Sequence, residues 1–317
     1  MKSEDDPRPE LARVAERVIE QETRSYRSLF TDAGRAVNEP VAGSLWHADS
    51  ACARGNEVAD GSLAYAVGQF QLLMRSIDNH AEALLLMMRH DRLLRTPAWA
   101  AARAVLEPVL MSCWLTQPDV SSEMRIARAA SLLPGVYQGA IALLPKFPGS
   151  DEELATKKEA RTDLVAYYAK HGFEVLTANK SGVSTGDITA VVYGGSRASI
   201  NHNITQLAGQ FLPDDPYLYG MLSGAVHSKL WVLNDISESA DEAIRAIVAP
   251  LMPVSDAYTN AICGYLGLDA GPILARRATR LNALMTRGSP PRNATQRGTA
   301  FGQLQSGLRV DEIARKR

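Results

Sequence analysis

Apolar residues recur at steps of three and four along most of the chain, the spacing that places them on one face of an α-helix. The first such segment, residues 9–36, predicts an amphipathic docking helix within an N-terminal unit 1–37. Proline, acidic and glycine residues mark the boundaries of the helices that follow. These helices are predicted at 62–95, 97–116, 119–144, 151–170, 217–233, 239–266 (one or two helices, interrupted by Pro250 and Pro253) and 271–285.

Two stretches lack this period. Residues 38–61 contain glycine, proline, asparagine and aspartate, which predict an irregular connection. Residues 173–195 are the least helical part, because β-branched and aromatic residues are interrupted by glycines there. We expect at most two short strands, at 173–177 and 188–193. A single kinked helix over 188–210 is the alternative to the second strand.

The pattern as a whole predicts an all-α fold, a multi-helix bundle of about eight to ten helices with at most two short strands. The helical core domain is expected to span 62–286. Residues 287–317 are polar, contain about seven basic and two acidic residues, and predict a disordered basic C-terminal tail. The apolar segment 81–94 predicts a core helix, with a homodimer interface through apolar helix faces as the alternative.

Composition limits the classes of partner. The 317 residues are 46% hydrophobic and carry a formal net charge of -1. The protein as a whole therefore does not attract nucleic acid electrostatically, and a nucleic acid could bind only at a local basic patch. The three cysteines are far apart and form no C-x-x-C pair, which argues against a disulfide framework. No signal segment or membrane span is apparent, so we expect a cytoplasmic protein. We expect no metal and no cofactor.

Three short motifs carry little weight. Residues 182–186 match G-x-S-x-G, but a nucleophilic serine elbow needs a large sheet that this chain lacks. Residues 194–197 (Gly-Gly-Ser-Arg) resemble an anion-binding turn without the lysine of a P-loop. The strings Arg75-x4-His80 and Arg197-x4-His202 place an arginine five residues before a histidine, at about the frequency that chance supplies.

Polar residues in otherwise apolar helices form a better candidate site, since buried helix faces seldom tolerate unpaired charge. Arg103 and Glu107 are four residues apart and are expected to pair on one face. We expect an arginine pair, a hydroxyl and an imidazole from two other helices to converge on them as an anion or phosphate site. These additional residues are Arg125, Arg128, Ser223 and His227. The alternative is a core polar network with surface ion pairs.

The same residues carry a family resemblance. Their order is Arg103-x3-Glu107, Trp114-Leu115, Pro118, Arg125-x2-Arg128 and Tyr217-x4-Leu222-Ser223-x3-His227. Over roughly residues 65–265 the chain resembles an uncharacterised group of all-helical proteins from high-G+C bacteria, which is similar in turn to HEPN-type helical domains. Many HEPN domains bind or cleave RNA in toxin and defence systems. A HEPN arginine would lie five to seven positions before His227, where this sequence has Gly220, Met221 and Leu222.

Two functions follow as hypotheses. In the first, the protein is a HEPN-like module of a defence or toxin system that binds RNA, either with or without cleaving it. His227 is then the general acid/base, Ser223 orients it, and Arg125 and Arg128 hold the phosphate. In the second, the protein is not a catalyst and the cluster binds a small anionic ligand, or the chain binds a protein partner in a regulatory or scaffold role. The sequence leaves open whether the protein is an enzyme.

Overall fold

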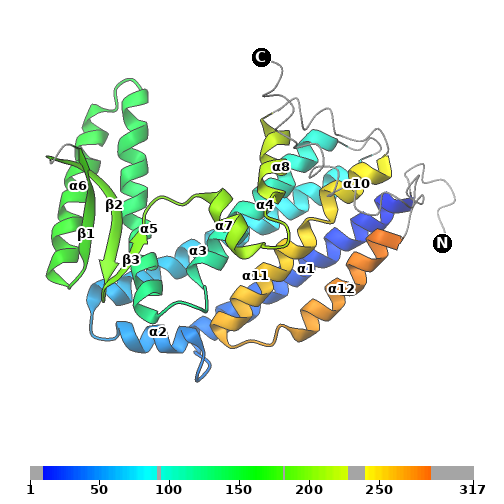
Figure 1. Cartoon of the computed structure of the whole chain (residues 1–317), viewed down its shortest axis with the longest axis horizontal. Coiled ribbons are helices and arrows are strands. Elements are labelled where there is room, and N and C mark those ends of the chain that lie inside the picture. The colour runs from blue at the N-terminus through cyan, green and yellow to red at the C-terminus, as the bar shows by residue number, and fades with distance from the viewer. Residues whose placement is uncertain (1–9, 91–93, 181–182, 228–239, 287–317) are drawn as a thin grey trace, which may run out of the picture.

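A computed structural model describes residues 10–90, 94–180, 183–227 and 240–286. The fold is an all-α bundle with a small sheet, as predicted (Figure 1). The helices are α1 (Glu10–Asn38), α2 (Leu45–Ala53), α3 (Glu57–Arg89), α4 (Arg95–Leu115), α5 (Ser122–Leu143), α6 (Asp151–Lys170), α7 (Ile204–Phe211), α8 (Leu218–Val226), α10 (Ala240–Val248), α11 (Leu251–Leu266) and α12 (Gly271–Thr286). The predicted tail 287–317 lies outside the described residues.

The prediction of an irregular connection over 38–61 is wrong, because this stretch contains α2 and the first turn of α3. Two of its polar residues, Ser44 and Asn56, are helix caps rather than loop residues. Ser44 accepts the backbone N–H of His47 at 3.1 Å, and Asn56 accepts that of Ala59 at 3.2 Å. Such caps satisfy donors that a first helical turn leaves unpaired. The periodicity missed α2 because a nine-residue helix spans less than three turns.

The sheet has three antiparallel strands in the order β1 (Glu174–Lys180), β2 (Val183–Tyr193) and β3 (Ser196–Ser199). The prediction of at most two short strands is therefore wrong, and so is the alternative of a kinked helix over 188–210. Gly194 and Gly195 have φ of 54° and 78°, which suits a two-residue hairpin turn between paired strands. Residues 194–197 thus form a hairpin rather than the start of an anion-binding helix.

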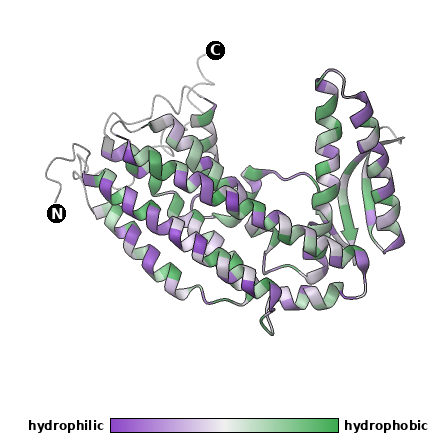
Figure 2. Cartoon of the chain, turned by 180° about the vertical axis from the view of Figure 1, so that it is seen from behind, coloured by the Kyte–Doolittle hydropathy of each residue, from purple (hydrophilic) through white to green (hydrophobic). Residues whose placement is uncertain are grey.

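α4 lies at the centre of the main core, where it packs against α3, α8 and α11. Its Val105, Leu106, Val109 and Leu110 are fully buried. The apolar face of α1 belongs to the same core, through contacts with α3, α10, α11 and α12. Hydrophilic and hydrophobic residues alternate along the long helices, as expected for helices with one face in a core (Figure 2). In segment 81–94, Leu84 and Met88 lie in this core.

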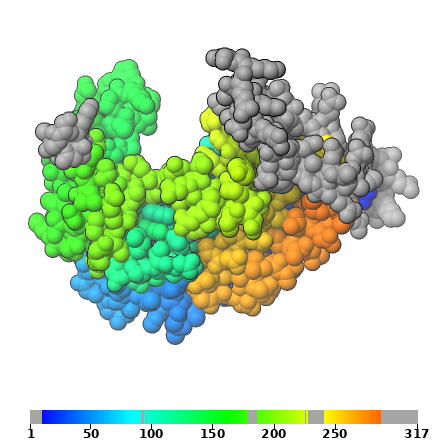
Figure 3. Space-filling model, in the orientation of Figure 1, coloured from blue at the N-terminus to red at the C-terminus, as the bar shows by residue number. Residues whose placement is uncertain are grey.

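A second, smaller apolar cluster joins α2, α3, α5 and α6 to the sheet. Tyr168 and Phe173 pack together there, and the Tyr168 hydroxyl donates to the Ala130 carbonyl at 3.0 Å. Of these elements, α5, α6 and the three strands form an arm at one end of the molecule (Figure 1). The surface has a hollow between this arm and α7 and α8 (Figure 3). None of the described helices combines the length and the apolar character needed to cross a membrane.

The three cysteines differ in accessibility. Cys113 and Cys263 are buried in the main core, whereas Cys52 is exposed on α2. Burial raises the pKa of Cys113 to about 12 and that of Cys263 to about 11. Because the thiolate is the reactive form, we expect one thiol to react with Ellman's reagent in the native protein at pH 8, and three after denaturation. Two or more fast thiols in the native protein would contradict this burial.

Candidate functional site

The structure divides the predicted cluster between two regions of α4. Arg103 and Glu107 lie in its middle turns, and His227, which directly follows α8, lies beside Arg103. Arg125 and Arg128 pack instead at the C-terminal end of α4, about 16 Å further along the helix axis. The expected convergence of all these residues at one anion site is therefore wrong for the arginine pair.

Arg103 is the hub of the first region, which we call the Arg103 cluster: Arg103, Glu107, Tyr219 and His227. Nε of Arg103 donates to Oε1 of Glu107 at 2.9 Å, which is the predicted pair within α4. Nη2 donates to the Tyr219 hydroxyl at 3.2 Å, and the guanidinium lies over the Tyr219 ring, 5.4 Å from its centroid. Nη1 lies 3.3 Å from Nε2 of His227. Since a guanidinium only donates, Nε2 is the acceptor and the ring proton sits on Nδ1.

The Arg103 cluster is open to solvent on one side. The Arg103 side chain is 19% exposed, and His227 is an exposed residue at the end of α8. Burial lowers the pKa of Arg103, but the hydrogen bond and negative charge of Glu107 outweigh it and raise the pKa above its ordinary value. A fixed cation thus lies beside an accessible imidazole, and the Nε2 lone pair of this imidazole is directed at the guanidinium.

Ser223 lies one turn before His227 on the same helix. Its backbone carbonyl accepts the N–H of His227 at 3.0 Å, as the helix requires. Among the described residues, no hydrogen bond links the Ser223 hydroxyl to the His227 ring. Within α8, the residue that contacts Arg103 is Tyr219, which was not among the predicted site residues. The signal for it was present, because Tyr219, Ser223 and His227 are spaced by four and share one face of the helix.

Arg125 has no N–H group left for a ligand. Nε and Nη2 form a bidentate pair with the carboxylate of Asp49 at 2.7 and 2.8 Å. Asp49 is 0% exposed and Arg125 is 3% exposed. The remaining N–H bonds go to the carbonyls of Gln117 and Val120 and to the hydroxyl of Ser122. These contacts account for the whole guanidinium, so the predicted phosphate contact has no free donor here.

Arg128, on α5, binds the C-terminal end of α4. Its Nη1 donates to the carbonyl of Trp114, whose ordinary helical partner would be the N–H of residue 118, a proline. Its Nη2 donates to Oε1 of Gln117 at 2.9 Å, and its guanidinium lies over the Trp114 ring, 5.1 Å from the centroid. The negative end of the helix dipole favours cations at this position. Burial, followed by repulsion from Arg125, lowers the pKa of Arg128 to about 10.

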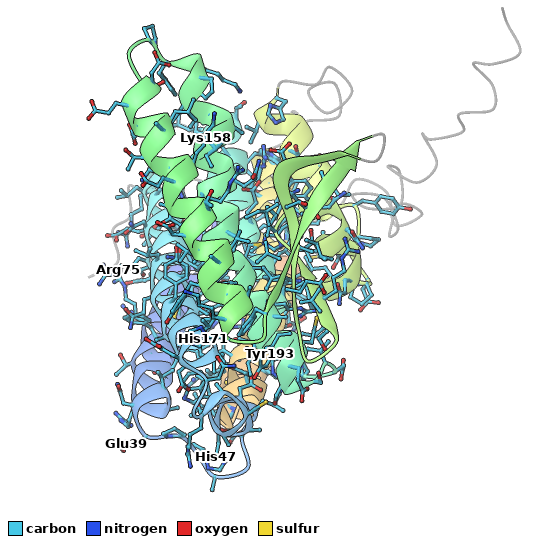
Figure 4. The ribbon with its side chains drawn as sticks, turned by 90° about the vertical axis from the view of Figure 1, so that its left-hand side faces the viewer. Glu39, His47, Arg75, Lys158, His171 and Tyr193 are labelled. Atoms are coloured by element: carbon cyan, nitrogen blue, oxygen red, sulfur yellow. The ribbon has the colours of Figure 1, made fainter. Side chains whose placement is uncertain are left out.

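The weaker motifs do not form sites. Arg75 is exposed on α3 and lies at its outer surface in Figure 4, and Arg197 is exposed on β3. His202 packs on the Trp114 ring at a centroid distance of 4.2 Å. Within the described ranges, neither R-x4-H string has an arginine in contact with its histidine. Gly182 of the G-x-S-x-G segment lies outside those ranges, and Ser184 pairs with Asn179 inside the sheet rather than occupying a strand-to-helix turn.

Comparisons of the chain with protein-family models, curated proteins and solved structures gave no match. The resemblance to HEPN-type domains therefore stays a prediction. In the described part of the chain, no group of three or more His, Cys, Asp or Glu residues is placed to hold a metal ion. Any function must accordingly be argued from the geometry of the side chains.

Proposed function

We propose that the protein is a HEPN-like RNA-binding module that cleaves RNA at the Arg103 cluster. The observation that supports this proposal is the 3.3 Å separation between Nη1 of Arg103 and Nε2 of His227. In HEPN domains the arginine and histidine come from one helix, whereas here the arginine comes from α4 and the histidine directly follows α8. A guanidinium suits phosphate recognition, and an imidazole moves a proton near neutral pH.

The roles follow from the positions of the groups. An N–H of Arg103 binds a non-bridging phosphate oxygen, while Glu107 fixes the guanidinium. Nε2 of His227 takes the proton from a ribose 2′-hydroxyl, and the 2′-oxygen forms a bond to phosphorus. The bond from phosphorus to the 5′-oxygen breaks, and the leaving oxygen takes the proton of the Tyr219 hydroxyl. His227 then returns its proton to Tyr219. The products are a 2′,3′-cyclic phosphate and a 5′-hydroxyl.

The surface hollow between the arm and α7 and α8 is open to solvent (Figure 3). α8 contains Tyr219 and is followed directly by His227, so we propose that a polynucleotide chain lies in this hollow when it reaches the Arg103 cluster. This arrangement favours RNA over a small anion that would need only a closed pocket. The near-neutral net charge requires the basic groups to act locally, as Arg103 does.

The test is an incubation of the purified full chain with total RNA and a defined tRNA pool, in EDTA and in Mg²⁺. We expect cleavage in both conditions by the wild type, with 2′,3′-cyclic phosphate ends. His227→Ala should lower the rate by about 100- to 10,000-fold, the range for loss of a general acid/base. Arg103→Gln should weaken cleavage as well, because the phosphate loses its cation.

The matched control is His80→Ala, which removes the histidine of the Arg75 string and should cleave RNA as the wild type does. Circular-dichroism melts establish that each variant is folded. Equal cleavage by the wild type and His227→Ala would overturn the proposal. So would the absence of cleavage by the folded wild type, which would favour a small anionic ligand or a protein partner instead.

A further inference from the structure

A cavity of about 300 Å³ lies between α1, α3, α5 and α11, at the C-terminal end of α4. Its walls are mainly apolar and include Phe30, Trp46, Phe70, Met74 and Leu266. Sites for small molecules in proteins have volumes of about 300–1,000 Å³ and are lined by apolar and aromatic side chains. The cavity lies at the lower end of that range.

Two hydroxyl groups that line the cavity, those of Thr116 and Tyr265, already donate hydrogen bonds within the protein. Thr116 donates to the Ser112 carbonyl at 2.8 Å, and Tyr265 donates to Oδ2 of Asp49 at 3.0 Å. Arg125 also faces the cavity, but Asp49 neutralises it and its N–H groups are occupied. A charged ligand would therefore be buried without a counter-charge, which is costly. The hydroxyl oxygens of Thr116 and Tyr265 can each still accept one hydrogen bond.

The space results from small residues where the helices face one another. Gly34 of α1 and Ala66 of α3 both line the cavity. A Cβ placed on Gly34 would meet no atom within 4 Å. Glycine weakens a helix interior, and empty apolar space forfeits dispersion contacts, so both features destabilise the unliganded chain. A bound apolar molecule would offset the second of these losses.

We propose that this cavity binds an uncharged, predominantly apolar small molecule that carries one hydroxyl or one neutral aromatic N–H group directed at Thr116 and Tyr265. The site is separate from the Arg103 cluster, and the inference does not depend on the proposed ribonuclease activity. The ligand class follows from the apolar walls and the absence of a free charged group among the described lining residues.

The probe is N-phenyl-1-naphthylamine, a neutral aromatic amine with one N–H, whose fluorescence rises in apolar surroundings. We expect a saturable rise with the wild-type chain. Gly34→Leu places a side chain in the cavity and should weaken binding by at least about tenfold, because the ligand and the leucine need the same space. Ala66→Leu fills the cavity from the opposite helix and should act likewise.

Gly68→Leu is the matched control, because Gly68 is an exposed residue of α3 with open space around its Cβ position and does not line the cavity. It should bind the probe as the wild type does, and so should His227→Ala, which tests independence from the Arg103 cluster. Circular dichroism confirms that the variants are folded. Absence of a saturable signal with the wild type, or equal affinity of folded Gly34→Leu, Ala66→Leu and Gly68→Leu, would overturn the proposal.

Discussion

Asp49→Asn should lower the free energy of unfolding by about 3–5 kcal/mol, the usual cost of breaking a buried ion pair from one side. Asp49 is fully buried and accepts two hydrogen bonds from Arg125 and one from Tyr265. Asparagine keeps the size of the side chain but removes its charge, and its amide group cannot replace both carboxylate oxygens as acceptors. The guanidinium of Arg125 would then remain buried without an anion.

Urea denaturation followed by circular dichroism measures this loss. Glu20→Gln is the control, because Glu20 pairs with Arg24 at the surface of α1. Such exposed pairs contribute about 0–1 kcal/mol, so the control should unfold close to the wild type. A loss below about 1 kcal/mol for Asp49→Asn would contradict the importance assigned to the buried pair. Because Arg125 and Tyr265 also line the apolar cavity, the variant should weaken probe binding as well.

Most of the helices could be predicted because acidic, glycine and proline residues mark their ends in the sequence. The acidic residues at 151–153 and the glycine at 172 bracket α6, and Pro250 separates α10 from α11. α2 was missed for the opposite reason. Its nine residues are too few for an apolar period to develop, and its capping residues Ser44 and Asn56 have the same composition as a loop.

The contacts of the candidate site were likewise predictable only where they lie within one helix. The Arg103–Glu107 pair was predictable because four residues separate the two side chains on one helix. The contact between Arg103 and His227 joins positions 124 residues apart, and only tertiary packing brings them together. Arg125 was misassigned because its partner, Asp49, lies 76 residues earlier in a segment interpreted as irregular. A buried arginine on an apolar helix therefore indicates that an acidic residue pairs with it. The sequence around the arginine does not identify that acidic residue.

Arg277→Met should also lower the free energy of unfolding by about 3–5 kcal/mol. Arg277 is 1% exposed and links α12 to α1 and α11. Its guanidinium donates to Glu22 at 2.8 Å, to Asp256 at 2.6 Å and to the Thr259 hydroxyl at 3.1 Å. Methionine restores some apolar packing but leaves the buried carboxylate of Glu22 with Arg280 as its remaining ion-pair partner in the described structure.

The neighbouring residue provides a matched control for this prediction. Arg276→Met removes the same charge from the same helix, but Arg276 is exposed and forms no ion pair with any described residue. It should change stability by less than about 0.5 kcal/mol. Arg277→Lys should fall between the two, because an ammonium keeps the charge but loses the fork that reaches Glu22 and Asp256 together. Equal urea midpoints for Arg277→Met and Arg276→Met would show that the network does not hold α12. Hydrogen exchange provides the local readout, since in Arg277→Met the amides of α12 should lose more protection than those of α4.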